Sequence, residues 1–314
     1  MSIAQRLADS ALINPGSDRV RSVAGLARRS ARSRAGRFLA EGPQCVREAL
    51  RAHLGEFDAL VPAPRDGVIG ALYITERALQ RHPDIDQLVE RVLQAEGSPR
   101  VFVRMVSDEV LAAMSDAEHP QGVLAVCRIP ELTWAQVAER RPRLVAVMCR
   151  VQDPGNAGTV LRAADAAGAD AVVLTAGSVD LHNPKVVRST AGSLFHLPVL
   201  TGLDPAELVG RPVSDAAGGE LQVLAADGYG ALDLDELQDA SAAGREAAVE
   251  LARPTAWLFG NEAQGLSEQE KALASHRVAV PLHGAAESLN VGTAATLCLY
   301  ASARAQRRTA EGAA

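Results

Sequence analysis

Three segments in the second half of the chain share one arrangement, in which an apolar run typical of a buried strand is followed at once by glycines and polar side chains. They span residues 151–162 (VQDPGNAGTVLR), 258–266 (LFGNEAQGL) and 280–291 (VPLHGAAESLNV). In open α/β sheets, the loops that follow the strands build the ligand site. One such turn is weak support, but three in one chain predict an α/β fold with a site at one edge of its sheet.

Strand-like and helix-like patterns alternate from residue 144 onward. Apolar runs predict strands at 144–148, 170–175, 222–225, 256–259 and 278–281. Helices are predicted over 159–167, from Asn183-Pro184, after the capping-box sequence at Ser267, and over 289–307. This alternation predicts a parallel or mostly parallel sheet.

Residues 17–128 also mix helical and extended patterns, which predicts a smaller α/β domain. A charged stretch follows, in which Trp134 is the single large apolar side chain. We interpret that stretch as an interdomain linker with room for a short helix. The expected organisation is an N-terminal domain (1–129), a linker (130–142), a C-terminal domain (143–308) and a tail (309–314).

The net charge of −6 conceals a basic stripe in the N-terminal domain. No acidic residue interrupts the stripe, which consists of Arg19, Arg21, Arg28, Arg29, Arg32, Arg34 and Arg37. It is a candidate RNA phosphate-binding surface, although a solvated basic helix or a disordered arm has the same pattern. Aromatic residues are only 3% of the chain, so platforms for stacking nucleobases are scarce.

Several classes of protein are disfavoured by the sequence. The cysteines lack disulfide or zinc-site spacing, and the histidines lack metal-ligand spacing, so we expect no metal. No secretory or membrane-spanning apolar run is present, so we expect a cytoplasmic protein without a membrane partner. Neither Gly-x-Gly-x-x-Gly after a strand nor a phosphate loop occurs, which disfavours dinucleotide oxidoreductases and P-loop nucleotidases.

The three segments offer candidate site residues. A helix beginning near Thr159 would place Arg162 in its first turn, beside free backbone amides and near Asn156. Glu262 is the only acid in its turn, and Ser288 precedes a helix. Taken singly, each has an ordinary structural interpretation: a turn cap for Asn156, a solvated Arg162, a plain strand-to-helix turn at Glu262, and an N-cap at Ser288.

Taken together, the segments resemble the signature motifs of the SPOUT superfamily, specifically the SpoU/TrmH-type RNA ribose 2′-O-methyltransferases. The resemblance covers residues 143–308. It is carried by Asn156, Gly158, Arg162, Gly260, Asn261, Glu262, Gly265, Leu266, Pro281, Gly284, Ser288, Leu289, Asn290, Val291 and the stretch 183–192. Gly292-Thr293 stands where the family commonly has Ser-Val, which predicts a looser helix start.

The resemblance implies a trefoil-knotted C-terminal domain with a parallel sheet, S-adenosylmethionine as the cofactor, and a homodimer. It also implies catalytic roles for Arg162 on the ribose 2′-hydroxyl, Asn156 holding it, Glu262 and Ser288 orienting groups, and Asn290 supporting the site. Cofactor contacts are implied at Thr175, Ala176, Gly177, Phe259, Gly260, Asn261, Val280, Leu282, Ser288 and Leu289. A guanidinium is a poor proton acceptor near neutral pH. Two interpretations follow: burial or the nearby sulfonium lowers the pKa of Arg162, or Arg162 chiefly holds an RNA phosphate.

The N-terminal domain is similar to a ribosomal-protein-like RNA-binding module found ahead of the catalytic domain in many of these enzymes. The similarity is carried by residues 37–43 (RFLAEGP) and 119–123 (HPQGV), and Lys185 and Arg188 extend the candidate RNA-binding set. We therefore expect methylation of 23S ribosomal RNA. Alternatives are a transfer-RNA 2′-O-methyltransferase, a thiopeptide-resistance methyltransferase, a small-molecule methyltransferase, and a non-catalytic RNA-binding or ribosome-assembly protein on the same fold.

Overall fold

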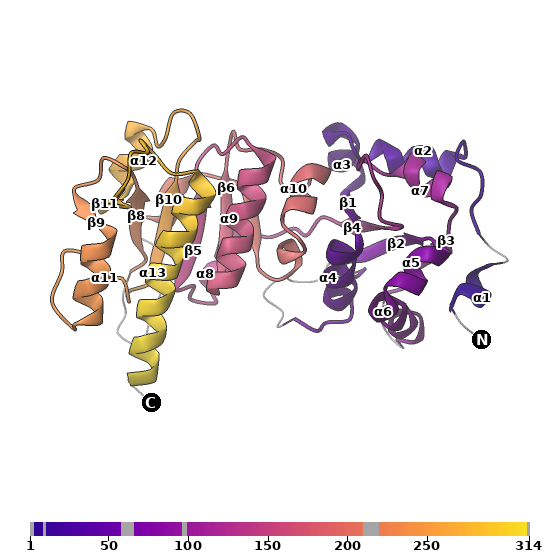
Figure 1. Cartoon of the computed structure of the whole chain (residues 1–314), viewed down its shortest axis with the longest axis horizontal. Helices are drawn as coiled ribbons and strands as arrows, with labels where there is room; N and C mark the ends of the chain where they lie inside the picture. Colours follow the sequence, from indigo (N-terminus) through magenta and orange to yellow (C-terminus); the bar gives the residue numbers. More distant parts are fainter. Residues whose placement is uncertain (1–2, 9–10, 58–65, 96–98, 210–219, 313–314) are drawn as a thin grey trace. The chain divides into compact units, whose positions relative to one another are not determined.

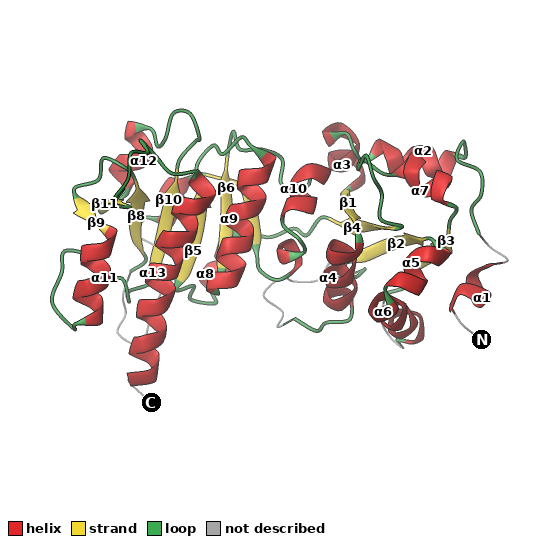
Figure 2. Ribbon diagram, in the orientation of Figure 1, coloured by secondary structure: helices red, strands yellow, loops and turns green. Residues whose placement is uncertain are grey.

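The computed structural model describes residues 3–8, 11–57, 66–95, 99–209 and 220–312 (Figures 1 and 2). The chain forms two compact units. The first comprises Met1–Glu131 and Asp180–His196, and the second comprises Leu132–Val179 and Leu197–Ala314. An α/β fold in both parts is as predicted. Among the described residues, no helix combines the length and apolar character needed to cross a membrane.

The first unit is built around a sheet with strand order β1-β4-β2-β3, in which β4 is antiparallel to both of its neighbours and β2 is parallel to β3. Its elements are α1 (Ile3–Ala8), α2 (Asp18–Gly25), α3 (Arg29–Ala35), β1 (Arg37–Glu41), α4 (Pro43–His53), β2 (Ile69–Ile74), α5 (Glu76–Arg81), α6 (Pro83–Gln94), β3 (Phe102–Met105), α7 (Asp108–Met114), β4 (Val123–Arg128), α10 (Pro184–Ser189) and the 3-10 turn η1 (Ser193–Phe195). Hydroxyl side chains start three of these helices, because Ser17, Thr75 and Ser107 each accept a hydrogen bond from a first-turn amide.

Residues 180–196 belong to the first unit, although the sequence analysis assigned them to the C-terminal domain. Val186 and Val187 of α10 are fully buried, and the Cys45 thiol donates to the Val187 carbonyl at 3.5 Å. Gly192 adopts a φ of +101°, and a Cβ added there would lie 2.5 Å from the Glu48 side chain. Apolar burial and this close backbone approach bind the segment to β1 and α4.

The second unit contains an all-parallel sheet with strand order β7-β6-β5-β10-β8-β11-β9. Its elements are α8 (Trp134–Ala138), β5 (Leu144–Met148), α9 (Pro154–Ala167), β6 (Ala171–Thr175), β7 (Val199–Leu203), the 3-10 turn η2 (Pro205–Leu208), β8 (Gln222–Ala226), β9 (Leu232–Asp233), α11 (Leu234–Ala242), β10 (Thr255–Phe259), α12 (Glu268–Leu273), β11 (His276–Ala279) and α13 (Val291–Gly312). Every residue of β5, β6 and β10 is buried, as expected for strands covered on both faces.

Two boundaries in the second unit differ from the sequence expectation. The expected linker contains α8, and its Trp134 is 4% exposed and packs in the core of this unit with Val145 and Leu258. Helix α13 runs to Gly312 and so includes most of the expected tail. The charged residues around Trp134 suggested a solvated connection, but one large apolar side chain supplies enough buried area to dock the short helix.

Candidate active site

The three signature segments meet at one edge of the seven-stranded sheet. In a parallel sheet all carboxyl ends point to the same edge, so the loops after β5, β6, β10 and β11 are neighbours. Helices α9 and α13 begin at this edge, and they pack against each other and against β5. The expected location of the site is therefore the place where the segments converge.

Helix α9 begins five residues earlier than the sequence analysis predicted. Asp153 is its N-cap and accepts a 2.8 Å hydrogen bond from the amide of Asn156, while Pro154 occupies the first helical position. Asn156 therefore lies in the first turn, and Arg162 lies in the third turn rather than the first. The Asp-Pro pair is the same start signal as Asn183-Pro184, and it was available in the sequence.

Glu262 joins the second segment to the first. Its carboxylate accepts hydrogen bonds from the backbone amides of Gln152 (3.1 Å) and Asp153 (3.0 Å) and from Asn156 Nδ2 (3.0 Å). Partial burial opposes ionisation, but these hydrogen bonds outweigh it and keep the pKa of the Glu262 carboxyl below its usual value. Glu262 is therefore a fixed anion that holds the start of α9 in place.

Asn156 and Asn290 extend this network to the third segment. Asn290 Nδ2 donates to Asn156 Oδ1 at 2.8 Å, and Asn290 Oδ1 accepts from the Gly292 amide at 2.8 Å. One continuous chain of hydrogen bonds thus runs from Glu262 through both asparagines to the start of α13. The two amide groups orient each other, because each asparagine uses both ends of its side chain.

Close backbone packing shapes two further points of the site. Residues 261 and 265 form a two-way backbone bridge, and a Cβ at Gly260 would lie 2.4 Å from the Gly265 carbonyl carbon. A Cβ at Gly292 would lie 2.7 Å from Thr159 Cγ2. Gly292 therefore allows α13 to approach α9 closely, which gives the departure from the family pattern a packing role rather than only a weaker helix start.

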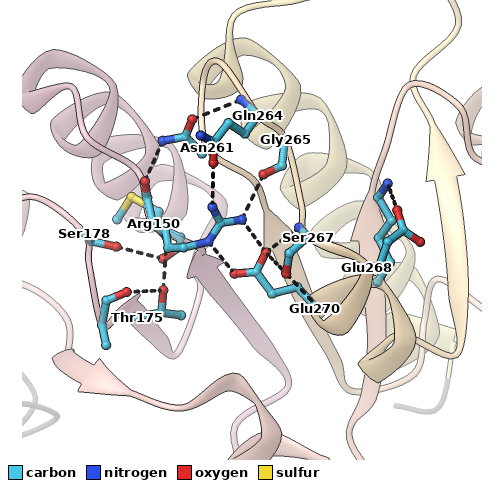
Figure 3. Close-up of polar contacts among 12 residues, drawn as sticks. Arg150, Thr175, Ser178, Asn261, Gln264, Gly265, Ser267, Glu268 and Glu270 are labelled. Carbon is cyan, nitrogen blue, oxygen red and sulfur yellow. Dashed lines mark hydrogen bonds and ion pairs between the residues drawn. The ribbon is translucent and has the colours of Figure 1, made fainter.

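Arg150 was not predicted by the sequence analysis, yet it connects much of this edge (Figure 3). Its guanidinium forms a two-pronged ion pair with Glu270, 3.0 Å from Nε to Oε1 and 2.7 Å from Nη2 to Oε2, and donates to the Gly265 carbonyl at 3.2 Å. Burial opposes ionisation of Glu270, but Arg150 and Ser267 outweigh it and lower the pKa of that carboxyl. Asn261 Nδ2 donates to the Arg150 carbonyl at 2.9 Å.

The backbone of Arg150 is unusual for a residue with a side chain, because its φ is +57°. Its amide donates to Thr175 Oγ1 at 3.0 Å, which joins the β5 and β6 loops. A positive φ outside glycine cannot be read from sequence, and Glu270 is 120 residues away, so no local pattern signals this residue.

The other predicted cofactor residues lie along the same edge. Phe259 and Gly260 are buried, Thr175 is 5% exposed, and Asn261 and Val280 are half-buried. The remaining predicted residues are exposed, namely Ala176, Gly177, Leu282, Ser288 and Leu289. The Gln152 side chain donates to the Gly177 carbonyl, so the exposed loop after β6 is held to the loop after β5.

Arg162 is exposed, and none of the hydrogen bonds and ion pairs among the described residues involves its guanidinium. The expectation that Asn156 holds Arg162 differs from the structure, because the Asn156 amide is committed to Glu262 and Asn290. Ser288 likewise has no polar contact among the described residues. Arg162 keeps all of its donors available for a ligand.

The predicted RNA-binding residues separate into two groups. Arg32 is 3% exposed, pairs with Asp180 and donates to the carbonyls of Leu26 and Ala27, so it is a structural residue. Arg188 pairs with Asp116 at 3.0 Å, Arg21 pairs with Asp18, and Arg19 lies over the Phe102 ring. The residues that are exposed and have neither an ion pair nor an aromatic ring contact among the described residues are Arg28, Arg29, Arg34, Arg37 and Lys185.

No group of three or more His, Cys, Asp or Glu side chains suited to a metal ion occurs among the residues that the structure describes. The four cysteines are buried and unpaired. Burial raises the pKa of the Cys298 thiol to about 12, as expected for an inert core thiol.

Comparison with known proteins matches both parts of the chain. Residues 143–300 match the SpoU rRNA Methylase family, and residues 17–125 match an MRM3-like substrate binding domain. The 23S rRNA (guanosine(2553)-2′-O)-methyltransferase RlmP of Bacillus subtilis is 37% identical over 62% of this chain and 70% of its own. The 23S rRNA (uridine(2479)-2′-O)-methyltransferase of Streptomyces viridochromogenes is 32% identical over 64% of this chain and 67% of its own.

Solved structures agree with these matches over almost the whole chain. The SpoU methyltransferase AviRb from Streptomyces viridochromogenes, in complex with the cofactor AdoMet, is 27% identical with a TM-score of 0.71, covering 93% of this chain and 99% of its own. An RNA 2′-O ribose methyltransferase is 28% identical with a TM-score of 0.69, covering 95% and 99%. The fold and these matches together are those of an RNA methyltransferase. The chain belongs to the SpoU rRNA Methylase family.

Proposed function

We propose that this protein transfers a methyl group from S-adenosylmethionine to a ribose 2′-hydroxyl of 23S ribosomal RNA. The observation that carries the proposal is the hydrogen-bonded set Glu262–Asn156–Asn290, which joins three loops at the sheet edge where α9 begins. Two turns further along α9, Arg162 is exposed and has no ion pair among the described residues. The relatives named above act on 23S ribosomal RNA, and this chain covers at least two thirds of their lengths.

The loops at the sheet edge suit a flat, cationic methyl donor. Gly177 puts no side chain in the way, and Ala176 and Leu282 are exposed residues whose amides and carbonyls would meet an adenine edge. We assign the holding of S-adenosylmethionine to the backbone of residues 175–177, 259–261, 280–282 and 288–289. When bound, this group supplies an electrophilic methyl carbon on a sulfonium.

The protein residues act mainly by positioning the reactants. Glu262, Asn156 and Asn290 fix the start of α9 relative to the other loops, so that Arg162 projects from a rigid element. The guanidinium of Arg162 donates to the ribose oxygen or the adjacent phosphate and aligns the hydroxyl with the methyl carbon. As the ribose oxygen takes the methyl group and the methyl–sulfur bond breaks to leave a neutral thioether, the hydroxyl proton would pass to solvent, because a guanidinium is a poor base. Ser288 orients the incoming groups from the third loop.

RNA docks on the exposed basic residues of the first unit in this proposal. Arg28, Arg29, Arg34 and Arg37 are solvent-exposed cations without ion-pair partners among the described residues, so their charge is available to phosphates. Lys185 adds a further exposed cation. The match of residues 17–125 to a substrate binding domain favours structured ribosomal RNA over transfer RNA.

We further propose that the protein is a cytoplasmic homodimer whose second unit is knotted at the loops after β10 and β11. Helix α13 presents large apolar side chains to solvent in the single chain, with Leu297 43% and Tyr300 47% exposed. Leu289, 36% exposed, precedes the helix. An apolar face of this kind is normally covered by a partner, and a second copy would cover it symmetrically.

The test is methyl transfer from radiolabelled S-adenosylmethionine to unmodified 23S ribosomal RNA and, in parallel, to bulk transfer RNA. The modified nucleotide is mapped by its resistance to alkaline cleavage. Label in 23S RNA that is lost in Arg162→Ala is the expected result. Label confined to transfer RNA would replace the substrate, and RNA binding without any transfer to either RNA or to ribosomal precursors would favour the non-catalytic alternative.

A further inference from the structure

The first unit contains a cavity of about 270 Å³ that the methyl-transfer site does not use. It is lined by the turn between β1 and α4 (Glu41, Gly42, Gln44, Cys45), by residues 119–121 ahead of β4, and by Arg188 of α10. These are the motifs RFLAEGP and HPQGV and the helix after Asn183, none of which has a role in the chemistry proposed above. All belong to the same compact unit.

The cavity has an apolar floor and a polar mouth. Leu111, Leu124 and Cys45 line it with buried, uncharged groups, while Gln44 and Gln121 are exposed carboxamides. Gln44 Oε1 accepts from Arg47 at 2.9 Å, which orients that amide. Gly42 has a φ of +87°, and a Cβ there would lie 3.1 Å from Gln121 Oε1, so glycine keeps the mouth open.

Arg188 brings an unsatisfied donor to the wall of the cavity. Its Nη2 donates to Asp116, but its Nη1 is buried without an acceptor among the described residues. Glu41 Oε2 lies 3.5 Å from Nη1, and the Glu41 carboxylate already accepts from Ser115 Oγ (2.6 Å) and from the amides of Asp116 (3.0 Å) and Ala117 (3.1 Å). The Arg188 guanidinium is therefore held at the wall of the cavity by two carboxylates, Asp116 and Glu41, while its Nη1 is covered by the protein.

We propose that this cavity binds one unpaired nucleotide of the RNA substrate, with its base on the apolar floor beside the Arg188 side chain and its edge read by Gln44 and Gln121. The inference rests on the proposed RNA substrate. The cavity is just below the range of roughly 300–1,000 Å³ typical of small-molecule sites, so it fits one nucleotide and not a duplex. Sequence-specific RNA recognition uses such splayed bases, read on their edges by polar groups.

The test compares the full-length protein with the variants Gln121→Ala, Gln44→Ala/Gln121→Ala and Arg188→Gln on unmodified 23S RNA. Gln80→Ala and Arg77→Gln are matched controls, because both side chains are exposed on α5 away from the cavity. The readouts are the RNA KM, kcat, the Kd for S-adenosylmethionine, and the dependence of RNA affinity on salt. Thermal melting checks that each variant is folded, and the two glutamine sites remain usable if Arg188→Gln is unstable.

We expect the double glutamine variant to raise the RNA KM about tenfold, while kcat, cofactor Kd and the salt slope stay unchanged, because no charge is removed. Unchanged RNA KM in the glutamine variants of an active enzyme overturns the cavity proposal and leaves the proposed function intact. A wild-type protein that binds but never methylates RNA overturns the proposed function instead. An equal rise of the RNA KM in Gln80→Ala would also overturn the cavity proposal, since it would show that the effect does not depend on the cavity.

Discussion

Polar side chains are used in opposite ways in the two units. At the sheet edge of the second unit, Glu262, Asn156 and Asn290 bind one another, and Arg150 is paired with Glu270. On the first unit, Arg28, Arg29, Arg34 and Arg37 are exposed without such partners in the part of the chain that the structure describes. The first arrangement fixes geometry, which methyl transfer requires. The second keeps charge available, which binding of a polyanion requires.

Arg162 of α9 differs from the other charged residues of the three segments, since it has no ion pair or hydrogen bond among the described residues. We expect Arg162→Ala to lower kcat by about 1,000-fold, as is usual when a group that holds the reacting atoms is lost, with melting temperature and cofactor Kd unchanged. Single-turnover methyl transfer measures the effect. Arg245→Ala, an exposed arginine after α11, is the matched control. Full activity in Arg162→Ala would falsify its assignment.

Substitution of the exposed arginines of the first unit tests whether they bind RNA phosphates. The quadruple variant of Arg28, Arg29, Arg34 and Arg37 to Gln should bind RNA about 100-fold more weakly at low salt, because the phosphate contacts are lost. It should also reduce the slope of log affinity against log salt by about 3. An unchanged salt slope in the quadruple variant would contradict the proposed surface.

In contrast to these exposed residues, the buried Arg32 pairs with Asp180 in the folded protein. Arg32→Gln should therefore lower the free energy of unfolding by about 3 kcal/mol, because it leaves the Asp180 carboxylate without its partner.

Glu262→Gln keeps the shape of the side chain but replaces one of its two acceptor oxygens by an NH₂ group, which then faces at least one of the three N–H donors. We expect kcat to fall about 30-fold, because the start of α9 loses a fixed acceptor. Since the folded-state pKa of Glu262 is lowered, its contribution to stability is present above the unfolded pKa and is lost as pH falls through the folded one. The variant should therefore lose less stability on acidification than the wild type in urea titrations. Glu268→Gln, on the exposed start of α12, is the control.

Arg150 separates the effect of the ion pair from that of backbone strain. Both Arg150→Ala and Arg150→Gly remove the pair with Glu270, and we expect either to raise the S-adenosylmethionine Kd several-fold by loosening residues 261–265. At a φ of +57°, Ala is strained and Gly is not, so the Gly variant should be more stable by about 1 kcal/mol. Equal unfolding midpoints for Arg150→Ala and Arg150→Gly would show that residue 150 does not keep its left-handed backbone conformation in the variants.

The smallest expected effect concerns His182, whose ring is tilted against that of Phe38 with ring centroids 4.7 Å apart. Burial lowers the pKa of His182 to about 4, although the nearby Asp180 acts in the opposite direction. The unfolded chain then binds more protons than the folded chain between pH 6.5 and 4, so stability is lost as pH falls through this window. His182→Phe should remove that part of the acid sensitivity. The same pH dependence in both proteins would contradict a buried neutral His182.

Sequence reasoning succeeded where a signal is local and failed where a contact is distant. Apolar runs located β5, β6, β8, β10 and β11 to within a few residues. The glycines and polar residues that follow these runs predicted three loops at one edge of the sheet. The start of α9 was misplaced, although Asp153-Pro154 carried the signal. Whether Arg32 is buried and whether Arg150 meets Glu270 depend on partners 148 and 120 residues away. The sequence therefore shows which residues are cationic, but it does not show which of them form an ion pair in the folded protein.

The place of β10 in the sheet also constrains how the chain is made. Residues 255–259 lie between β5 and β8, both of which precede them in the chain, with Ala256 opposite Val145 on one side and Val223 on the other. During synthesis, the strands β7, β6 and β5 therefore cannot be joined to β8 in one sheet until β10 has left the ribosome. A nascent chain up to about residue 250 carries two unjoined sheet edges and an open core, a state prone to aggregation. Premature termination before β10 should thus yield insoluble fragments, rather than a smaller folded protein.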